Sequence, residues 1–251
     1  MRYTDLIFDL YGTLADVWTE EDDNTWEKTA EFFHRHGTDI TGTRLKAEFE
    51  QALQKRERSA SEGEYLEYRM EELFMELYAK ITPQMPPDGF SVSAARCFRS
   101  ASMRQLRCFD GALEALSALR DHGCRLWLFS NAQAVFTVPE LKELGLSEAF
   151  DGIYLSSDFG FRKPDPRFYS ALLNEQGLDV RRCLMIGNDR ETDISGARGV
   201  GMDTLFLHTR QTPSDQPPAD PDRSPRTKSG LSEYELEGCD WPMLAERIPR
   251  L

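Results

Sequence analysis

Short apolar runs that end in polar residues recur along this chain, and they alternate with segments of helical periodicity. The first run, Leu6 to Phe8, is rich in strand formers and is followed by Asp9 and Gly12. A continuous apolar run of this length is typical of a strand buried on both faces of a parallel sheet. The pattern predicts that this strand ends at Asp9 and that a turn follows at Gly12.

The residues after Leu14 have a helical pattern for roughly ninety positions. In the second of these segments, for example, Leu45, Phe49 and Leu53 recur at intervals of four and share one helix face. The predicted helices cover residues 24–36, 43–59, 64–81 and 92–106. Four consecutive helices after a single strand predict an inserted all-helical subdomain over residues 15–106.

From Phe109 onward the chain alternates strands with helices, as βαβ units do. Predicted strands at 125–129, 153–155, 183–186 and 203–207 alternate with helices at 112–122, 139–144 and 167–176 and a helix ending near 199. The fold class is therefore α/β, with a core formed by residues 1–14 and 107–251 around a mostly parallel central sheet. Within it, residues 211–231 are rich in Pro, Ser and Asp and predict a surface loop, and residues 233–251 a short strand and a last helix.

Composition narrows the class of protein. The 251 residues are 40% hydrophobic and 29% charged, which is typical of a globular chain. A net charge of -13 argues against a nucleic-acid partner, and no apolar run approaches the length of a membrane span. The five cysteines form no CxxC pair, so we expect reduced thiols and a cytoplasmic protein. The sequence leaves the oligomeric state open.

Four polar clusters follow the predicted strands: Asp9, Ser130 with Asn131, Lys163, and Asp189 with Asp193. Singly, each is as well explained by a turn, a solvated lysine or a helix cap. Right-handed crossovers would place all four at one edge of one sheet, where ligands bind in open α/β folds. A nucleophilic acid, a hydroxyl, an ammonium and an acidic pair are together suited to phosphoryl transfer through an aspartyl-phosphate.

These four clusters resemble the motifs of the haloacid dehalogenase (HAD) superfamily. The matching segments are FDxxGTL at Phe8 to Leu14, SNA at Ser130 to Ala132, KPDP at Lys163 to Pro166 and GNDRETDI at Gly187 to Ile194. As an ordered set the four motifs are specific, although each alone is weak. The resemblance implies a Rossmann-like core and a helical C1-type cap that closes over a small phosphorylated substrate.

The resemblance also implies roles for individual residues. Asp9 attacks the substrate and forms a covalent ester that water hydrolyses, while Ser130 and Lys163 hold the transferring group. Thr13 orients the first loop and Asn131 helps to position the substrate. The implied cofactor is Mg²⁺, bound by Asp9, the Tyr11 backbone carbonyl, Asp189, and Asp193 either directly or through water. Asn188 occupies a position that is often Asp in the family.

Tyr11 departs from the phosphatase pattern, which has a second Asp two residues after the nucleophile as the general acid. A phenol titrates near pH 10 and donates a proton poorly at neutral pH. FDxYGTL followed by Asp16 instead resembles the 2-haloacid dehalogenases, in which the leaving halide needs no proton. Two alternatives therefore stand beside a phosphatase: a 2-haloacid dehalogenase, and a catalytically weakened HAD protein with a binding role.

Charge counting favours the phosphatase. Asp9, Asp189 and Asp193 bring three negative charges, and Lys163 brings one positive charge. Three carboxylates in a dry site raise one another's pKa unless a cation joins them, and Mg²⁺ would bring the sum to zero. The sequence thus predicts a Mg²⁺-dependent phosphatase of a small phosphorylated metabolite.

Overall fold

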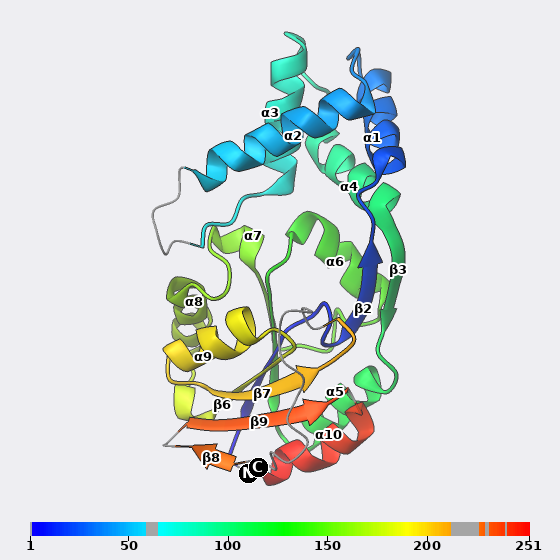
Figure 1. Ribbon diagram of the computed structural model, residues 1–251. Coiled ribbons are helices and arrows are strands. Elements are labelled where there is room, and N and C mark those ends of the chain that lie inside the picture. The colour runs from blue at the N-terminus through cyan, green and yellow to red at the C-terminus, as the bar shows by residue number, and fades with distance from the viewer. Residues whose placement is uncertain (1, 59–64, 212–225, 229–230, 239) are drawn as a thin grey trace.

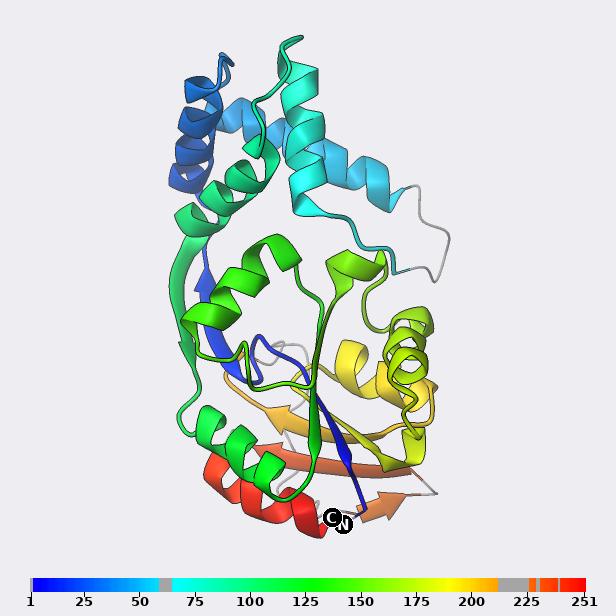
Figure 2. The same cartoon turned by 180° about the vertical axis from the view of Figure 1, so that it is seen from behind.

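The computed structural model describes residues 2–58, 65–211, 226–228, 231–238 and 240–251 (Figure 1). Most of the predicted surface loop over residues 211–231, and Cys239, lie outside the described residues. The two ends of the chain lie close together at the base of the molecule in both views (Figures 1 and 2). In the described part of the chain, no helix combines the length and the apolar character needed to cross a bilayer.

A seven-stranded sheet forms the centre of the core, in the order β5-β4-β1-β6-β7-β9-β8. The strands are β1 (Asp5–Phe8), β4 (Arg125–Ser130), β5 (Gly152–Leu155), β6 (Cys183–Gly187), β7 (Asp203–His208), β8 (Arg226–Lys228) and β9 (Leu231–Glu237). All neighbours are parallel except β8, which runs antiparallel to β9 at one edge. The central strand β1 pairs with β4 and β6, so that Phe8 lies opposite Leu128 and Ile186. The predicted mostly parallel, Rossmann-like sheet is confirmed.

Helices cover both faces of this sheet (Figures 1 and 2). They are α5 (Ala112–Asp121), α6 (Ala134–Glu143), α7 (Ser156–Phe159), α8 (Pro166–Gln176), α9 (Gly196–Gly199) and α10 (Trp241–Arg247). Phe8 packs on one face with residues of α5 and α10, whereas Ile7 packs on the other with residues of α8 and α9. Because successive strand side chains point to opposite faces, β1 is buried on both sides.

Four helices form a second body beyond the carboxyl ends of the core strands (Figure 1). They are α1 (Asp23–Arg35), α2 (Gly42–Glu57), α3 (Met70–Ile81) and α4 (Phe90–Ser102). Their apolar faces share one cluster that includes Phe33, Phe74 and Phe98, each of them buried. Burying one such side chain is worth roughly 1.5–3 kcal/mol, so this cluster is a substantial core of its own. Val135 and Phe136 of α6 belong to the same cluster and connect it to the sheet.

The two ends of the insertion are strands, so the prediction of an all-helical insertion is wrong at both ends. β2 (Ala15–Thr19) and β3 (Met103–Cys108) form an antiparallel pair that joins the two bodies. The helix predicted over 92–106 therefore ends at Ser102. Met103 and Leu106 are three residues apart, which is compatible with either structure, and only the pairing with Ala15 to Thr19 selects the strand.

Two further helix boundaries differ from the prediction. The helix expected over 64–81 begins at Met70, because the preceding residues run along the core instead, as described below. The helix expected at 139–144 begins five residues earlier, at Ala134, and contains Pro139. Proline has no amide hydrogen to donate within a helix and is therefore most common in the first turn, which predicts a helix start at Pro139. In the structure α6 continues through Pro139.

Candidate active site

Asp9 lies where β1 ends, at the carboxyl edge of the sheet. Its backbone N–H donates to the Ile186 carbonyl at 3.0 Å, so the ladder to β6 continues up to this residue. The turn that follows requires a glycine at position 12, where φ is +83°. A side chain at Gly12 would also meet Asn188 Nδ2 at 2.4 Å. The loop after Asp9 therefore packs directly against the loop that follows β6.

Lys163 is the cation of the site, and its ammonium group is fully buried. Nζ donates to Asp9 Oδ1 at 2.8 Å, to Asp193 Oδ1 at 2.6 Å and to the Phe129 carbonyl at 3.0 Å. All three ammonium hydrogens thus have acceptors. Burial alone lowers the pKa of Lys163, but the Asp193 and Asp9 carboxylates raise that pKa above its ordinary value. The lysine is a permanent positive charge beside the candidate nucleophile.

Two hydroxyls complete the surroundings of the Asp9 carboxylate. Ser130 Oγ donates to Oδ1 at 3.2 Å, and Thr13 Oγ1 lies 3.2 Å from Oδ2. Thr13 Oγ1 also lies 3.1 Å from Asn188 Oδ1, so its single hydrogen is shared between two acceptors. Asp9 is held in one orientation by groups from three separate loops.

Asn131 holds the Lys163 backbone. Its Oδ1 accepts from the Lys163 N–H at 2.7 Å, and its Nδ2 donates to the Lys163 carbonyl at 3.0 Å. This paired bond fixes the segment that carries the ammonium group against the end of β4. The part that Asn131 plays towards a substrate stays a prediction.

The acidic residues after β6 form a π-helical turn, Arg190–Ser195. Asp189 Oδ1 caps that turn by accepting from the N–H groups of Glu191 and Thr192 at 2.8 and 3.0 Å. Asp193 Oδ2 accepts from the Asp189 N–H at 3.0 Å, while its other oxygen binds Lys163. Burial raises the pKa of Asp193, and Lys163 opposes that shift. Asp193 is thus first of all the partner of Lys163.

Tyr11 points its phenol away from Asp9 and towards α6. Its hydroxyl donates to Glu140 Oε2 at 2.5 Å and lies 3.0 Å from Thr137 Oγ1. Glu140 in turn binds Arg99 of α4 through two bonds of 2.6 and 3.0 Å. Burial, and then the Glu140 carboxylate, raise the pKa of the Tyr11 phenol well above its usual value. Nothing in the sequence pattern pointed to Glu140 or Arg99, since they lie on different helices.

The carboxyl edge of the sheet encloses a cavity of about 240 Å³. It is lined by Asp9, Tyr11, Ser130, Asn131, Lys163, Asn188, Asp189, Thr192, Asp193 and Gln211. The structure thus brings together every predicted site residue except Thr13, which lies behind Asp9. Asn188 and Gln211 also line it, and neither was assigned a role from the sequence.

The donor atoms of this cavity suit a hard dication. The carboxylates of Asp9 and Asp189 and the amide of Asn188 offer only oxygen ligands, as Mg²⁺ prefers. Among the described residues, no three His, Cys, Asp or Glu side chains form a ready-made metal cluster. Magnesium sites commonly use one or two carboxylates and are completed by water and substrate phosphate, so this donor set fits.

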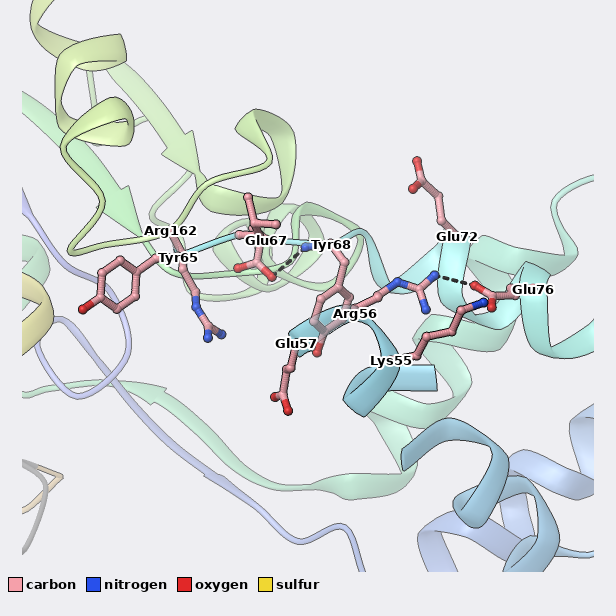
Figure 3. Close-up of a pocket in the computed structure, with 10 residues that line it drawn as sticks. Lys55, Arg56, Glu57, Tyr65, Glu67, Tyr68, Glu72, Glu76 and Arg162 are labelled. Atoms are coloured by element: carbon pink, nitrogen blue, oxygen red, sulfur yellow. Dashed lines mark hydrogen bonds and ion pairs between the residues drawn. The ribbon is translucent and has the colours of Figure 1, made fainter. Parts of the chain in front are cut away.

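A second cavity of about 670 Å³ lies between the helical body and the core (Figure 3). The ends of α2 and α3, the segment between them and Arg162 of the core line it. Figure 3 shows Tyr65 and Arg162 next to each other at one end of the group of lining residues. Arg162 immediately precedes Lys163, so consecutive residues line the two cavities.

A family model described as haloacid dehalogenase-like hydrolase matches residues 6–201. The chain belongs to this family. Curated relatives include a glyceraldehyde 3-phosphate phosphatase of Methanothermobacter thermautotrophicus, 29% identical over 47% of this chain and 53% of that protein. Another is a phosphoglycolate phosphatase of Agrobacterium fabrum, 33% identical over 43% of this chain and 46% of that protein. The chain thus spans about half the length of these two relatives.

The fold of this haloacid dehalogenase-like chain is shared with solved structures. One is a 2-haloacid dehalogenase of Pseudomonas syringae pv. Tomato, with a TM-score of 0.64 and 17% identity over 99% of both chains. At that identity the likeness concerns the fold alone. It leaves the choice between phosphate and halide chemistry to the residues of the site.

Proposed function

We propose that this protein is a Mg²⁺-dependent phosphatase of a small phosphorylated metabolite, acting through Asp9. The observation that carries the proposal is that Asp9 and Asp189 line one cavity together with Lys163, whose ammonium group is bound to Asp9 and Asp193. Carboxylate oxygens gathered in one cavity are the ligands that Mg²⁺ prefers, and water and substrate phosphate would complete its coordination. The phosphatase names of the relatives at 29% and 33% identity support the same reading.

Asp9 is the nucleophile in this proposal. One of its oxygens attacks phosphorus, the bond from phosphorus to the leaving oxygen breaks, the leaving oxygen takes a proton from solvent water, and an aspartyl-phosphate forms. Lys163 and Ser130 neutralise and orient the phosphoryl oxygens, since both already lie within hydrogen-bond distance of Asp9. Water then attacks phosphorus, the bond to Asp9 breaks, and phosphate leaves with the Asp9 carboxylate restored.

Mg²⁺ would be held by Asp9, Asp189 and the Tyr11 carbonyl, with Asn188 close enough to share the cavity. When bound, it supplies positive charge against the phosphoryl oxygens. Asp193 keeps Lys163 in place. The larger cavity, of about 670 Å³, is the proposed room for the rest of a small substrate.

The test is phosphate release from a panel of phosphorylated metabolites with Mg²⁺ present. We expect one or more compounds to be hydrolysed, and we expect both EDTA and Asp9→Asn to abolish the release. Turnover that survives chelation would show that the metal assignment is wrong. Turnover that survives in Asp9→Asn would exclude Asp9 as the nucleophile.

A second candidate, a 2-haloacid dehalogenase, is favoured by one observation. The Tyr11 hydroxyl donates to Glu140 and so offers no proton to a leaving group. A leaving halide needs none. Chloride release from 2-chloropropionate without added metal, together with no phosphate release from the panel, would select this candidate instead.

A further inference from the structure

Residues Tyr65–Met70, here called the strap, lead into α3 and run along the core. Leu66 forms a bridge with Phe161, the residue two before Lys163. The Glu67 N–H donates to the Gly160 carbonyl and the Arg162 N–H donates to the Tyr65 carbonyl, both at 2.9 Å. The strap therefore pairs, like a short antiparallel strand, with the loop that leads into the catalytic lysine.

The Glu67 carboxylate ties the strap to the other catalytic loop. Its Oε2 accepts from Ser156 Oγ at 2.7 Å, and its Oε1 accepts from Gln133 Nε2 at 3.1 Å and from the Tyr68 N–H at 3.1 Å. Figure 3 shows the bond to Tyr68. Three donors converge on this side chain, which an ionised carboxylate satisfies and an amide does not.

Gln133 strengthens the same connection. Its Nε2 also donates to the Tyr68 carbonyl at 2.8 Å, and its Oε1 accepts from the Met70 N–H at 2.8 Å. Gln133 lies two residues after Asn131, and Ser156 Oγ accepts from the intervening Ala132 N–H at 2.9 Å. The strap is thus bonded to the segment that follows Ser130 as well as to the segment that precedes Lys163.

We infer that Glu67 is a positioning residue for the reaction at Asp9, acting through the two loops that carry Ser130, Asn131 and Lys163. This inference rests on the proposed hydrolysis at Asp9. Asn131 already joins those loops from within the site. Glu67 joins them from the side of the helical body, so the docking of that body is coupled to the placement of the ammonium group. Displacing a catalytic group by about 1 Å can cost about 100-fold in rate.

The experiment compares Glu67→Ala and Glu67→Gln with Glu48→Gln as the matched control. Glu48 binds Lys80 inside the helical body and contacts neither loop in the described structure. We expect Glu67→Ala to lower kcat by at least about 10-fold with a smaller change in KM, because the loops that carry Ser130 and Lys163 shift, whereas Glu67 is one of several residues that line the larger cavity. Glu67→Gln should lie between Glu67→Ala and the wild type, and Glu48→Gln should match the wild type.

Hydrogen exchange supplies a readout that does not depend on turnover. The amides of Glu67 and Arg162 should exchange faster in Glu67→Ala, while amides within α3 keep their wild-type protection. If Glu67→Ala fails to fold, Gln133→Ala replaces it, and the same loss of kcat is expected.

A wild-type kcat with unchanged exchange at the Glu67 and Arg162 amides, or a rise in KM alone, would overturn the inference. If the wild-type protein hydrolyses no phosphate ester, the proposed function fails, and unchanged exchange still overturns the coupling by itself.

Discussion

At the scale of single residues, Tyr11 shows how the site departs from the pattern its neighbours follow. Its phenol is bonded to Glu140, and Glu140 is neutralised by Arg99 from α4. Arg99 Cζ also lies 5.5 Å from the centre of the Tyr11 ring. The side chain that replaces the expected general acid is therefore part of a buried network between α4, α6 and the first loop.

We predict that Tyr11→Phe keeps kcat within about threefold of the wild type, because the phenol gives its proton to Glu140 and not to the substrate. The free energy of unfolding should fall by about 1–2 kcal/mol, the usual cost of leaving a buried acceptor without one of its donors. Phosphate-release kinetics and urea unfolding measure the two effects. A loss of kcat beyond about 100-fold with unchanged stability would instead identify the phenol as a general acid.

The positions of the proposed catalytic residues were predictable because each lies after a predicted strand, and parallel strands end at one edge of a sheet. Asp9, Ser130 and Lys163 therefore came together as expected. The sequence did not predict which carboxylate would bind Lys163, since positions 189 and 193 are both Asp and lie in the same motif. In the structure, the π-helical turn places Asp193 so that one of its oxygens accepts from the Asp189 N–H and the other binds Lys163.

At the scale of elements, β9 braces the acidic turn. Glu235 on β9 binds Arg190, the residue after Asp189, through two bonds of 3.0 and 3.2 Å. The Arg190 guanidinium also lies 4.0 Å from the centre of the Phe206 ring. Strand β9, which follows the predicted βαβ series, thus supports Arg190 and, through it, the neighbouring Asp189, one of the proposed metal-binding residues.

We predict that Glu235→Ala lowers the free energy of unfolding by about 2 kcal/mol and weakens Mg²⁺ binding, because Arg190 loses a buried partner. Urea unfolding and titration of activity with Mg²⁺ measure these effects. The control is Arg181→Ala, which removes the exposed pair with Asp179, leaves the Asp179 cap on the backbone N–H of residue 181 in place, and should change stability by less than about 0.5 kcal/mol. Equal effects of both variants would show that β9 does not support the turn.

Elements with strong periodicity, such as α1 and α2, were predictable to within about two residues. The pair formed by β2 and β3 was not, because its partners are more than eighty residues apart and each strand is stabilised only by the other. The strap was missed for the same reason. Leu66 and Met70 fit a helical face, but the backbone of residues 65–67 bonds to the core loop instead.

At the scale of the whole molecule, the net negative charge of the chain and the carboxylates of its active site both lower the stability of the folded state by electrostatic repulsion. A net charge of -13 disfavours the compact state through self-repulsion, and any dissolved cation relieves part of it. The site concentrates this effect, since the carboxylates of Asp9 and Asp193 bind the buried Lys163 ammonium group and Asp189 lines the same cavity. Two effects of Mg²⁺ on stability are therefore expected, one general and one confined to the site.

We predict that Mg²⁺ raises the Tm of the wild-type protein more than KCl does at equal ionic strength, because a ligand that binds only the folded state stabilises it. At a concentration of 100 times Kd the gain is about 2.7 kcal/mol in the free energy of unfolding. In Asp189→Asn the general effect of ionic strength should remain while the excess due to Mg²⁺ becomes much smaller. Thermal unfolding of both proteins in the two salts measures this difference. Because each protein is compared with itself, a change in starting stability caused by the substitution does not enter the result. Equal shifts in MgCl₂ and KCl for the wild type would mean that the carboxylates at the sheet edge hold no dication, and the metal assignment would then be wrong.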